Sequence, residues 1–512
     1  NSSLSSSFEY IRQSEAWLGS ENASGLQYLP VQRISFAEAY LNKSDGKFVN
    51  YYQSDNSYEW GALTESFFRL NPKIVFYGKL HYANFTGKNM GGSVFINPYY
   101  NAFDIVEKAD DSRGEKNKED YHLIGAVSAK LSSKWTIGGK IDYEAANYAK
   151  YKDLRHINKL LDLKTTAGVS YSLGKTGDVG INYFYRRSVE SLQIKMYGTT
   201  DRVYFSLVSF GSFYGKKEIY GTGGYTDKDE SHPTVNQFQG ASLQLNLQFS
   251  QPWNLFNELS YKSRSGYYGE KAPGAPIFTE HQANILSYSG TLSYKKLNQH
   301  HCLIISAETE QLENNENIFK LNPSPGGGQK DVIYYGSNQV LDRTVSNVKA
   351  LYTADLGVQE YLPTWTLQVG GDFYNRQQKV SVYPFYRKQN IHFQDVYLSA
   401  CKNKVIDRKS MYSILLGVLY ASGGGVFHDD GVFQKPAESQ ENPETTDFNL
   451  YHEYEYLTAS HLKGNIGITY SRLLNPSVRG YIRANYELTN ALGGYFRNQK
   501  QSLIMLAIGC NF

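Results

Sequence analysis

Residues 501–512 read QSLIMLAIGCNF, and bulky apolar residues alternate there with smaller or more polar ones. Ile504, Leu506 and Ile508 share one parity, to which Phe512 also belongs. Alternate residues of a β-strand point to opposite faces, so a period of two indicates a strand with one apolar face. We therefore predict that residues 501–512 form a strand whose apolar face meets an apolar environment.

The same alternation recurs at 243–250, 367–374 and 478–489, where one face is apolar and the other polar. The alternation at 478–489 is longer than a typical strand of a β-sandwich, which usually has about five or six residues. A strand that crosses a bilayer at a tilt needs about nine to eleven residues. The length of the pattern thus favours membrane-spanning strands over a β-sandwich.

The composition excludes several classes of protein. The mean hydropathy is −0.50, and the 512 residues contain no run of about 18 apolar residues that could form a spanning helix. The 44 Tyr residues suit membrane interfaces, and the 45 Gly residues suit curved sheets. A formal net charge of +3 lacks the basic excess of a nucleic-acid-binding protein.

The connections between alternating stretches fall into two sets. Tight connections that contain turn-forming residues lie at 71–73, 132–133, 174–178, 251–252, 297–298, 361–364, 402–408 and 474–477. Long polar connections lie at about 87–118, 190–234, 265–280, 313–342, 377–390 and 421–447. Short periplasmic turns and long extracellular loops are typical of outer-membrane β-barrels. Trp135, Trp253 and Trp365 each lie just after a tight connection, as an aromatic girdle predicts.

Counting the connections gives a topology. Eight tight connections join sixteen strands, and one strand within 33–54 plus residues 501–512 make eighteen, with sixteen as the alternative. We predict an all-β fold, with a transmembrane antiparallel β-barrel over residues 33–512 in the outer membrane of a Gram-negative bacterium. Residues 1–32 show little strand pattern, and we predict a segment that lies in the lumen or on the periplasmic face.

A terminal strand that ends in an aromatic residue resembles the closing strand of bacterial outer-membrane barrels, whose end resembles the signal read by the barrel assembly machinery. The resemblance implies that Phe512 is a C-terminal assembly signal and that lipid and this machinery are partners. Lipid-facing residues would be Ile504, Leu506, Ile508, Cys510 and Phe512, whereas Met505, Ala507 and Asn511 would face inward.

Charged residues on the polar parity are candidates for the lumen. Facing lipid near the bilayer midplane would cost about 2–4 kcal/mol for each Arg or Lys. The candidates are Arg479, Arg483 and Glu487 on one strand and Lys140, Asp142 and Glu144 on another. They would form either an internal network that rigidifies a filled barrel or the lining of a solute path.

Enzyme motifs are scarce, and we predict neither an enzyme nor a cofactor. The sequence contains no G-x-S-x-G, G-x-x-x-x-G-K-[ST] or H-E-x-x-H motif. Whether the protein binds a metal ion stays open. Residues 428–430, with the sequence HDD, could supply metal ligands but are more typical of a solvated loop tip. The mixed charges at 107–118 predict a flexible, solvated loop.

Two segments, at 20–46 and 51–98, resemble an uncharacterised family of outer-membrane β-barrel proteins from Bacteroidota, a domain of unknown function. Genes of this family tend to lie beside those of TonB-dependent receptors and surface lipoproteins. The resemblance implies a non-enzymatic subunit or channel in the acquisition of a nutrient (a metal, haem or another solute). A surface lipoprotein or a TonB-dependent receptor is the implied partner, and no site residues are carried over.

Two other functions remain open at this point. The first is a passive porin or a channel for hydrophobic substrates that resembles fatty-acid transporters, with residues 1–32 as a hatch. The second, which is less favoured, is a barrel lipase or protease. The sequence shows no TonB box or large plug domain, so we do not expect a self-sufficient TonB-dependent transporter.

Overall fold

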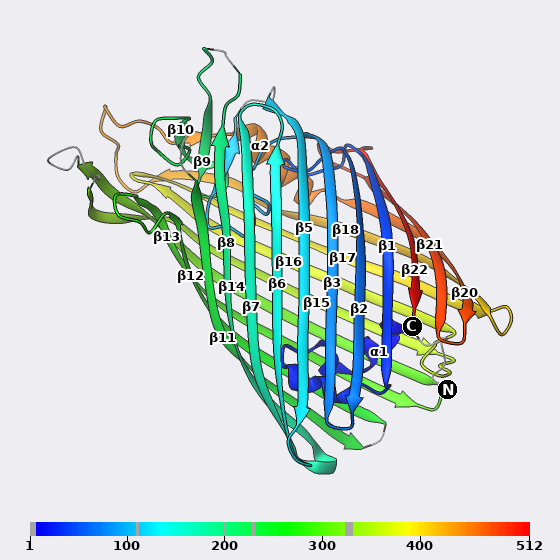
Figure 1. The fold of residues 1–512 in the computed structure, drawn as a ribbon. Helices are drawn as coiled ribbons and strands as arrows, with labels where there is room; N and C mark the ends of the chain where they lie inside the picture. Colours follow the sequence, from blue (N-terminus) through cyan, green and yellow to red (C-terminus); the bar gives the residue numbers. More distant parts are fainter. Residues whose placement is uncertain (1–6, 109–111, 199–200, 228–230, 251, 323–330) are drawn as a thin grey trace.

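The computed structural model describes the chain except for residues 1–6, 109–111, 199–200, 228–230, 251 and 323–330. Eighteen strands form one antiparallel sheet that closes into a barrel (Figure 1), which confirms the predicted fold and strand number. The barrel strands are β1 (Arg33–Gly46), β2 (Asn56–Asn71), β3 (Ile74–Met90), β5 (Gly114–Lys130), β6 (Trp135–Lys150), β7 (Arg155–Ser172), β8 (Gly177–Lys195), β11 (His232–Ser250), β12 (Trp253–Gly269), β13 (Ile277–Lys296), β14 (Gln299–Asn322), β15 (Asp331–Leu356), β16 (Trp365–Val382), β17 (Phe385–Val405), β18 (Ser410–Val432), β20 (His461–Asn475), β21 (Val478–Ala491) and β22 (Lys500–Asn511).

Strands β22 and β1 close the barrel. Their register pairs Asn511 with Phe36 and Gln501 with Gly46. The Phe512 backbone N–H extends this seam by donating a hydrogen bond to the Ser35 carbonyl at 3.0 Å.

The outer face of the barrel is apolar. Leu243, Ile482 and Ile508 are each more than half exposed, and each belongs to the apolar parity of its strand. Since these strands are long enough to cross a bilayer, the protein lies in the outer membrane of a Gram-negative bacterium. Separately, no described helix is long and apolar enough to span a membrane.

Several strands extend further than predicted at the extracellular end. Strands β16 and β17 are joined through Tyr383–Pro384, so the predicted loop at 377–390 is wrong. Strands β14 and β15 likewise take up most of 313–342. Beyond the bilayer neither face of a strand must meet lipid, so these polar stretches lack the alternation on which the prediction relied.

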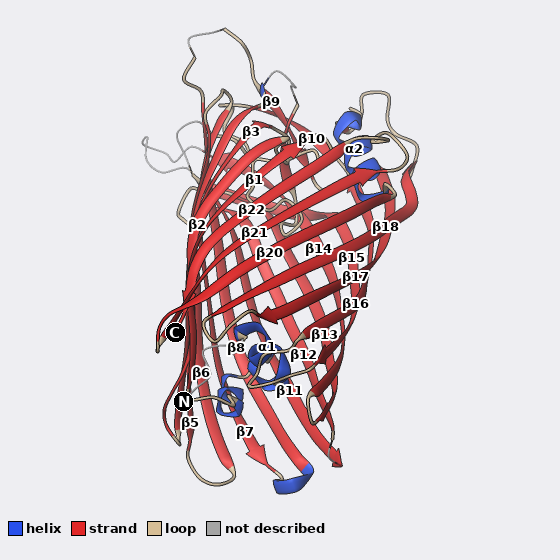
Figure 2. Ribbon diagram, turned by 90° about the vertical axis from the view of Figure 1, so that its right-hand side faces the viewer, coloured by secondary structure: helices blue, strands red, loops and turns tan. Residues whose placement is uncertain are grey.

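Three short helices fill part of the periplasmic end of the lumen (Figures 1 and 2). They are α1 (Phe8–Ser14), η1 (Ala16–Gly19) and η2 (Ala23–Tyr28), and we call residues 8–28 the lower plug. Ile11 and Leu26 belong to an apolar cluster with Phe67 and Val75 of the barrel wall. Residues 8–28 therefore lie inside the lumen, whereas the sequence left a luminal and a periplasmic placement of residues 1–32 open.

Three long loops fold together at the extracellular end and form what we call the upper plug. They contribute β4 (Asp104–Glu107), β9 (Phe205–Ser209), β10 (Tyr214–Ile219), β19 (Glu444–Thr445) and α2 (Asp447–Thr458). The four strands form a second sheet in the order β19-β10-β9-β4. Ile105, Val208 and Phe210 pack against Leu341 and Val380 of the barrel. The loops are thus folded elements with their own core.

Candidate functional site

The lower plug packs most closely against one side of the lumen. Its helix η2 contacts β3, β5, β6 and β7. A Cβ atom at Gly138 would lie 2.2 Å from the Ser24 nitrogen, and one at Gly168 would lie 2.2 Å from Asn22 Oδ1. The Asn22 amide also donates to the Val169 carbonyl at 3.1 Å. Glycine at these two wall positions therefore lets the plug approach the sheet closely.

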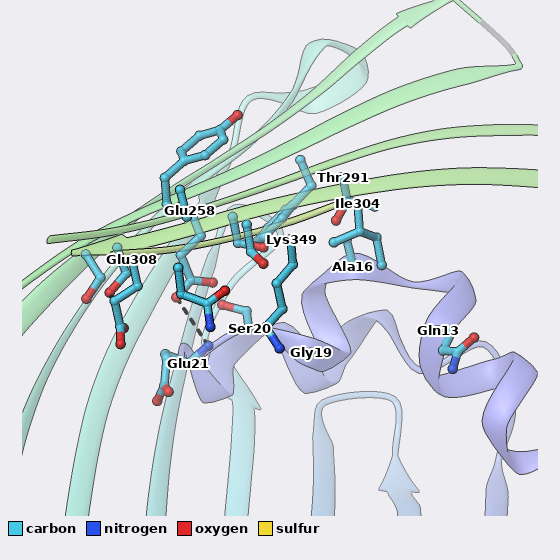
Figure 3. A pocket seen from close by; sticks show the side chains of 18 of the residues that line it. Gln13, Ala16, Gly19, Ser20, Glu21, Glu258, Thr291, Ile304, Glu308 and Lys349 are labelled. Atoms are coloured by element: carbon cyan, nitrogen blue, oxygen red, sulfur yellow. Dashed lines mark hydrogen bonds between the residues drawn. The ribbon is translucent and has the colours of Figure 1, made fainter. Parts of the chain in front are cut away.

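The opposite wall faces a cavity of about 540 Å³ beside η1 (Figure 3). The wall leaves space for this cavity because its side chains on β12, β13 and β14 are small and carry hydroxyl groups. They are Ser260, Ser287, Ser289, Thr291 and Ser306. The only dashed contact in this view joins the plug to the wall, where the Glu21 backbone N–H donates to Glu258 at 3.3 Å. A second cavity of about 790 Å³ shares Glu15 and Ala16 with the first. The lower plug thus leaves polar space along β11 to β15.

The upper plug is seated on a different part of the wall. Its apolar core packs against inward residues of β12 to β16, among them Tyr268 and Leu312. A cavity of about 470 Å³ remains on the side of β1 to β3 and β20 to β22. Aromatic side chains that line it are Phe48, Tyr52, Phe85, Tyr148 and Tyr456, and charged ones are Glu59, Lys118, Lys463 and Glu487. In the order of the closed sheet, this wall lies diametrically opposite β12 to β15.

Paired charges line the inward face of the barrel beside the two plugs. The pairs are Arg483–Glu38, Lys463–Glu487, Lys118–Asp120, His122–Asp142, Arg186–Asp162, Lys164–Glu21, Lys262–Glu308 and Lys349–Asp372. Most of these side chains are half-buried, so water and a small solute can reach them. We call this set the charge belt.

The six predicted lumen residues all lie on the inward face, but on two separate strands. On β21, Arg483 contacts Glu38 at 2.5 Å and Glu487 contacts Lys463 at 3.1 Å. Arg479 lies lower on the same strand and donates to the Lys409 carbonyl at 3.2 Å.

On β6, Asp142 contacts His122 Nε2 at 2.7 Å. Lys140 pairs in register with Ala126 and Glu144 pairs with His122, which places both on the same inward face. The prediction missed Asp162, Lys164 and Arg186 of the charge belt, although the same parity applied to β7 and β8 would have found them.

The predicted solvated loop at 107–118 is wrong for its two ends. Lys116 and Lys150 are buried and both form ion pairs with Glu107, at 3.6 Å for Lys116. Lys116 also donates to the Ser93 carbonyl at 2.8 Å. These contacts fasten β4 of the upper plug to β5 and β6. Residues 109–111 lie outside the described part of the chain.

Asp104 is a second buried acid of the upper plug. It accepts hydrogen bonds from Ser93 at 2.6 Å and from Tyr51 at 3.2 Å. Burial raises the pKa of the Asp104 carboxyl to about 7, although both hydrogen bonds oppose this shift. Asp104 is therefore partly protonated at neutral pH.

The HDD stretch considered for metal binding lies at the end of β18. Its Asp430 carboxylate is held by Arg387, at 2.7 and 2.8 Å, and His428 Nδ1 lies 3.3 Å from Asp430. Within the described part of the chain, no group of three His, Cys, Asp or Glu side chains could hold a metal ion.

Comparison with known proteins places the chain in a family. Residues 23–512 match a family of unknown function, DUF6850. The chain belongs to this family. The membership of an uncharacterised family expected from the sequence is thereby confirmed. No curated protein matches the sequence.

Solved structures with related folds have little sequence in common with this chain. The RagAB peptide importer in its closed-closed state has 6% identity and a TM-score of 0.41, over 93% of this chain and 86% of that chain. BauA, the ferric preacinetobactin receptor from Acinetobacter baumannii, has 9% identity and a TM-score of 0.37, over 93% and 80%. The CymD monoaromatic hydrocarbon channel has 8% identity and a TM-score of 0.31, over 98% and 96%.

Proposed function

We propose that this barrel carries a polar solute across the outer membrane as the channel subunit of a nutrient-acquisition system. The observation that supports this proposal is the placement of the two plugs. Each plug packs most closely against one part of the wall and leaves a cavity beside another part, and ion pairs of the charge belt line both cavities. A solute would enter beside β20 to β22, cross the belt and leave beside β12 to β15.

The lining favours a solute that bears hydroxyl or amide groups. Serine and threonine side chains can both donate to and accept from such groups. An apolar solute would have to strip water from the charged side chains of the belt, which is unfavourable. This argues against the channel for hydrophobic substrates. A bare metal ion would need a cluster of carboxylate or imidazole ligands, and within the described residues no three such side chains are grouped closely enough, although single glutamates line this wall.

Conductance across planar bilayers tests the transport proposal. The full chain should conduct weakly, and deletion of residues 7–28 should raise the conductance sharply because the lower plug is removed. Liposome swelling with a small neutral sugar should increase in parallel. Circular dichroism of the deletion variant controls for the barrel fold. A folded deletion variant with unchanged conductance and swelling would refute a path along this wall.

We also propose that a surface lipoprotein or a TonB-dependent receptor docks on the extracellular end. Phe448 and Tyr451 of α2 and Tyr495 of the β21–β22 connection are exposed beside one another. Exposed aromatic side chains are enriched at protein interfaces. Purification from native membranes in mild detergent should recover such a partner with the wild type, and less of it with the double variant Phe448→Ser, Tyr451→Ser. Recovery of the barrel alone would exclude this partner.

A further inference from the structure

Four inward arginines hold the upper plug to the barrel wall. Arg264, Arg343, Arg376 and Arg387 come from β12, β15, β16 and β17, and each is at least nine-tenths buried. Three of them donate to backbone carbonyls of the plug loops. Arg264 donates to Tyr100 at 2.6 Å, Arg343 to Asn101 at 3.3 Å and Arg387 to Ser212 at 3.2 Å.

Three of these four arginines also have a carboxylate partner. Their ion pairs are Arg264–Glu310 at 2.7 Å, Arg376–Glu453 at 2.9 Å and Arg387–Asp430 at 2.7 Å. No carboxylate among the described residues forms an ion pair with Arg343. The carboxylate that acts most strongly on Arg343 is Glu310, which is already ion-paired with Arg264, so these two buried arginines share one counter-charge.

A small cavity of about 50 Å³ lies beside this guanidinium, between the upper plug, α2 and the strands β15 and β16. Arg343 and Arg376 both line it, and the Nε–H group of each is buried without an acceptor. One water molecule needs about 10–15 Å³ by this measure. The cavity can therefore hold a halide ion with one or two waters, but not a larger organic ligand.

Two carboxylates also line the cavity, and both are already engaged. Glu453 accepts from Arg376 through both oxygens, at 3.2 and 2.9 Å. Asp104 accepts from Ser93 and Tyr51. Because burial keeps Asp104 partly protonated near neutral pH, its repulsion of a nearby anion is weakened.

We propose that this cavity binds a small monovalent anion, such as chloride. The anion adds a counter-charge close to Arg343 and accepts from the two free Nε–H groups. It thereby ties the loops around Asn101 and Ser212 to β15 and β16, and its occupancy holds the upper plug in its seat.

Bromide is a direct probe, because its anomalous scattering distinguishes it from water. Crystals of the full chain grown in sodium bromide should show an anomalous peak within hydrogen-bonding distance of Arg343 Nε and Arg376 Nε. A cavity without such a peak would show that it holds only water, and this would overturn the proposal. This experiment needs no variant and does not depend on transport.

Hydrogen exchange gives an independent test in solution. Amides of residues 92–107 and 205–219 should exchange several-fold more slowly in sodium chloride than in sodium gluconate of equal ionic strength, because gluconate does not fit the cavity. Arg343→Gln should abolish this difference. The control is Arg497→Gln, which removes an exposed arginine at the same end of the barrel and should keep the difference. Equal exchange of the wild type in the two salts would count against the anion.

Discussion

Glu107 is the counter-charge of two buried lysines, and its replacement provides a residue-level prediction. Glu107→Gln removes the carboxylate that is ion-paired with both Lys116 and Lys150, which stay buried. Breaking a buried pair typically costs about 3–5 kcal/mol, so the upper plug should detach from β5 and β6. Limited proteolysis should then cleave the β3–β5 loop much faster than in the wild type.

The matched control is Glu308→Gln, which breaks the more exposed pair with Lys262. Exposed pairs are worth less than about 1 kcal/mol, so proteolysis should hardly change. Equal sensitivity of the two variants would contradict the assignment of Glu107 as the anchor of the upper plug.

Asp104 predicts a pH dependence of the same plug. Its pKa rises from 3.8 to about 7 in the folded chain. Between these values the folded chain keeps a proton that the unfolded segment has lost, so stability is full below about pH 4 and falls as the pH rises toward 7. Hydrogen exchange of residues 92–107, corrected for intrinsic rates, should therefore show weaker protection at pH 8 than at pH 5.

Asp104→Asn cannot titrate and should remove the part of this pH dependence that Asp104 causes. The asparagine oxygen can still accept from one of the two hydroxyls, Ser93 or Tyr51, and its NH2 group can donate to the oxygen of the other, so the fold of the loop should persist. If the variant retained the full pH dependence, other groups would be responsible.

At the level of elements, the seat of η2 predicts how the lower plug can be displaced. Gly138→Val places a side chain where the Ser24 backbone lies, and the plug must leave its seat. Conductance in planar bilayers should rise toward that of the deletion variant. Gly125→Val on the neighbouring strand is the control, because a Cβ atom there meets nothing within 4 Å. Unchanged conductance in a folded Gly138→Val barrel would show that the plug does not limit flow.

The seam between β22 and β1 predicts a defect in assembly. Phe512 is 38% exposed on the outer face, beside the Arg33 guanidinium at 5.0 Å. Phe512→Asp places a charge toward lipid at the closing pair of strands, so the amount of folded barrel in the outer membrane should fall several-fold. Phe433→Asp alters an exposed aromatic residue beyond β18 and should fold normally. A normal level of folded Phe512→Asp barrel would disprove the role of Phe512 as an assembly signal.

At the level of the whole molecule, contact with the bilayer determines which parts of the fold could be predicted from the sequence. Lipid forces apolar residues onto every second position of a spanning strand, so the alternation over 478–489 predicts β21 and its inward face. No such constraint acts on the upper plug, whose strands have between two and six residues. A short strand with both faces buried shows no hydrophobic period. Polar and apolar residues are not separated onto two faces of α2, so its sequence shows no clear helical pattern.

The same reasoning explains the errors within the candidate site. Lys116 belongs to a run of charges that reads as a solvated loop, because its partners Glu107 and Lys150 come together only in the folded barrel. The position of residues 8–28 was undetermined, because their apolar side chains would suit a luminal wall or a periplasmic surface equally well. Contacts that form only in the folded barrel, such as the approach of Ser24 to Gly138, distinguish the two.

If transport requires each plug to leave its seat, the two plugs obstruct the path in series. Minor conformational states are populated at roughly 0.1–10%, and we take about 1% for the open state of each plug. If each plug opens independently at that level, both are open together only about 0.01% of the time. Each plug can then open frequently by itself without opening a continuous path through the barrel. The cell therefore remains protected from detergents and toxic solutes. Conversely, the loss of one plug multiplies the leak about a hundredfold, so such variants should sensitise the bacterium before any loss of uptake is noticed.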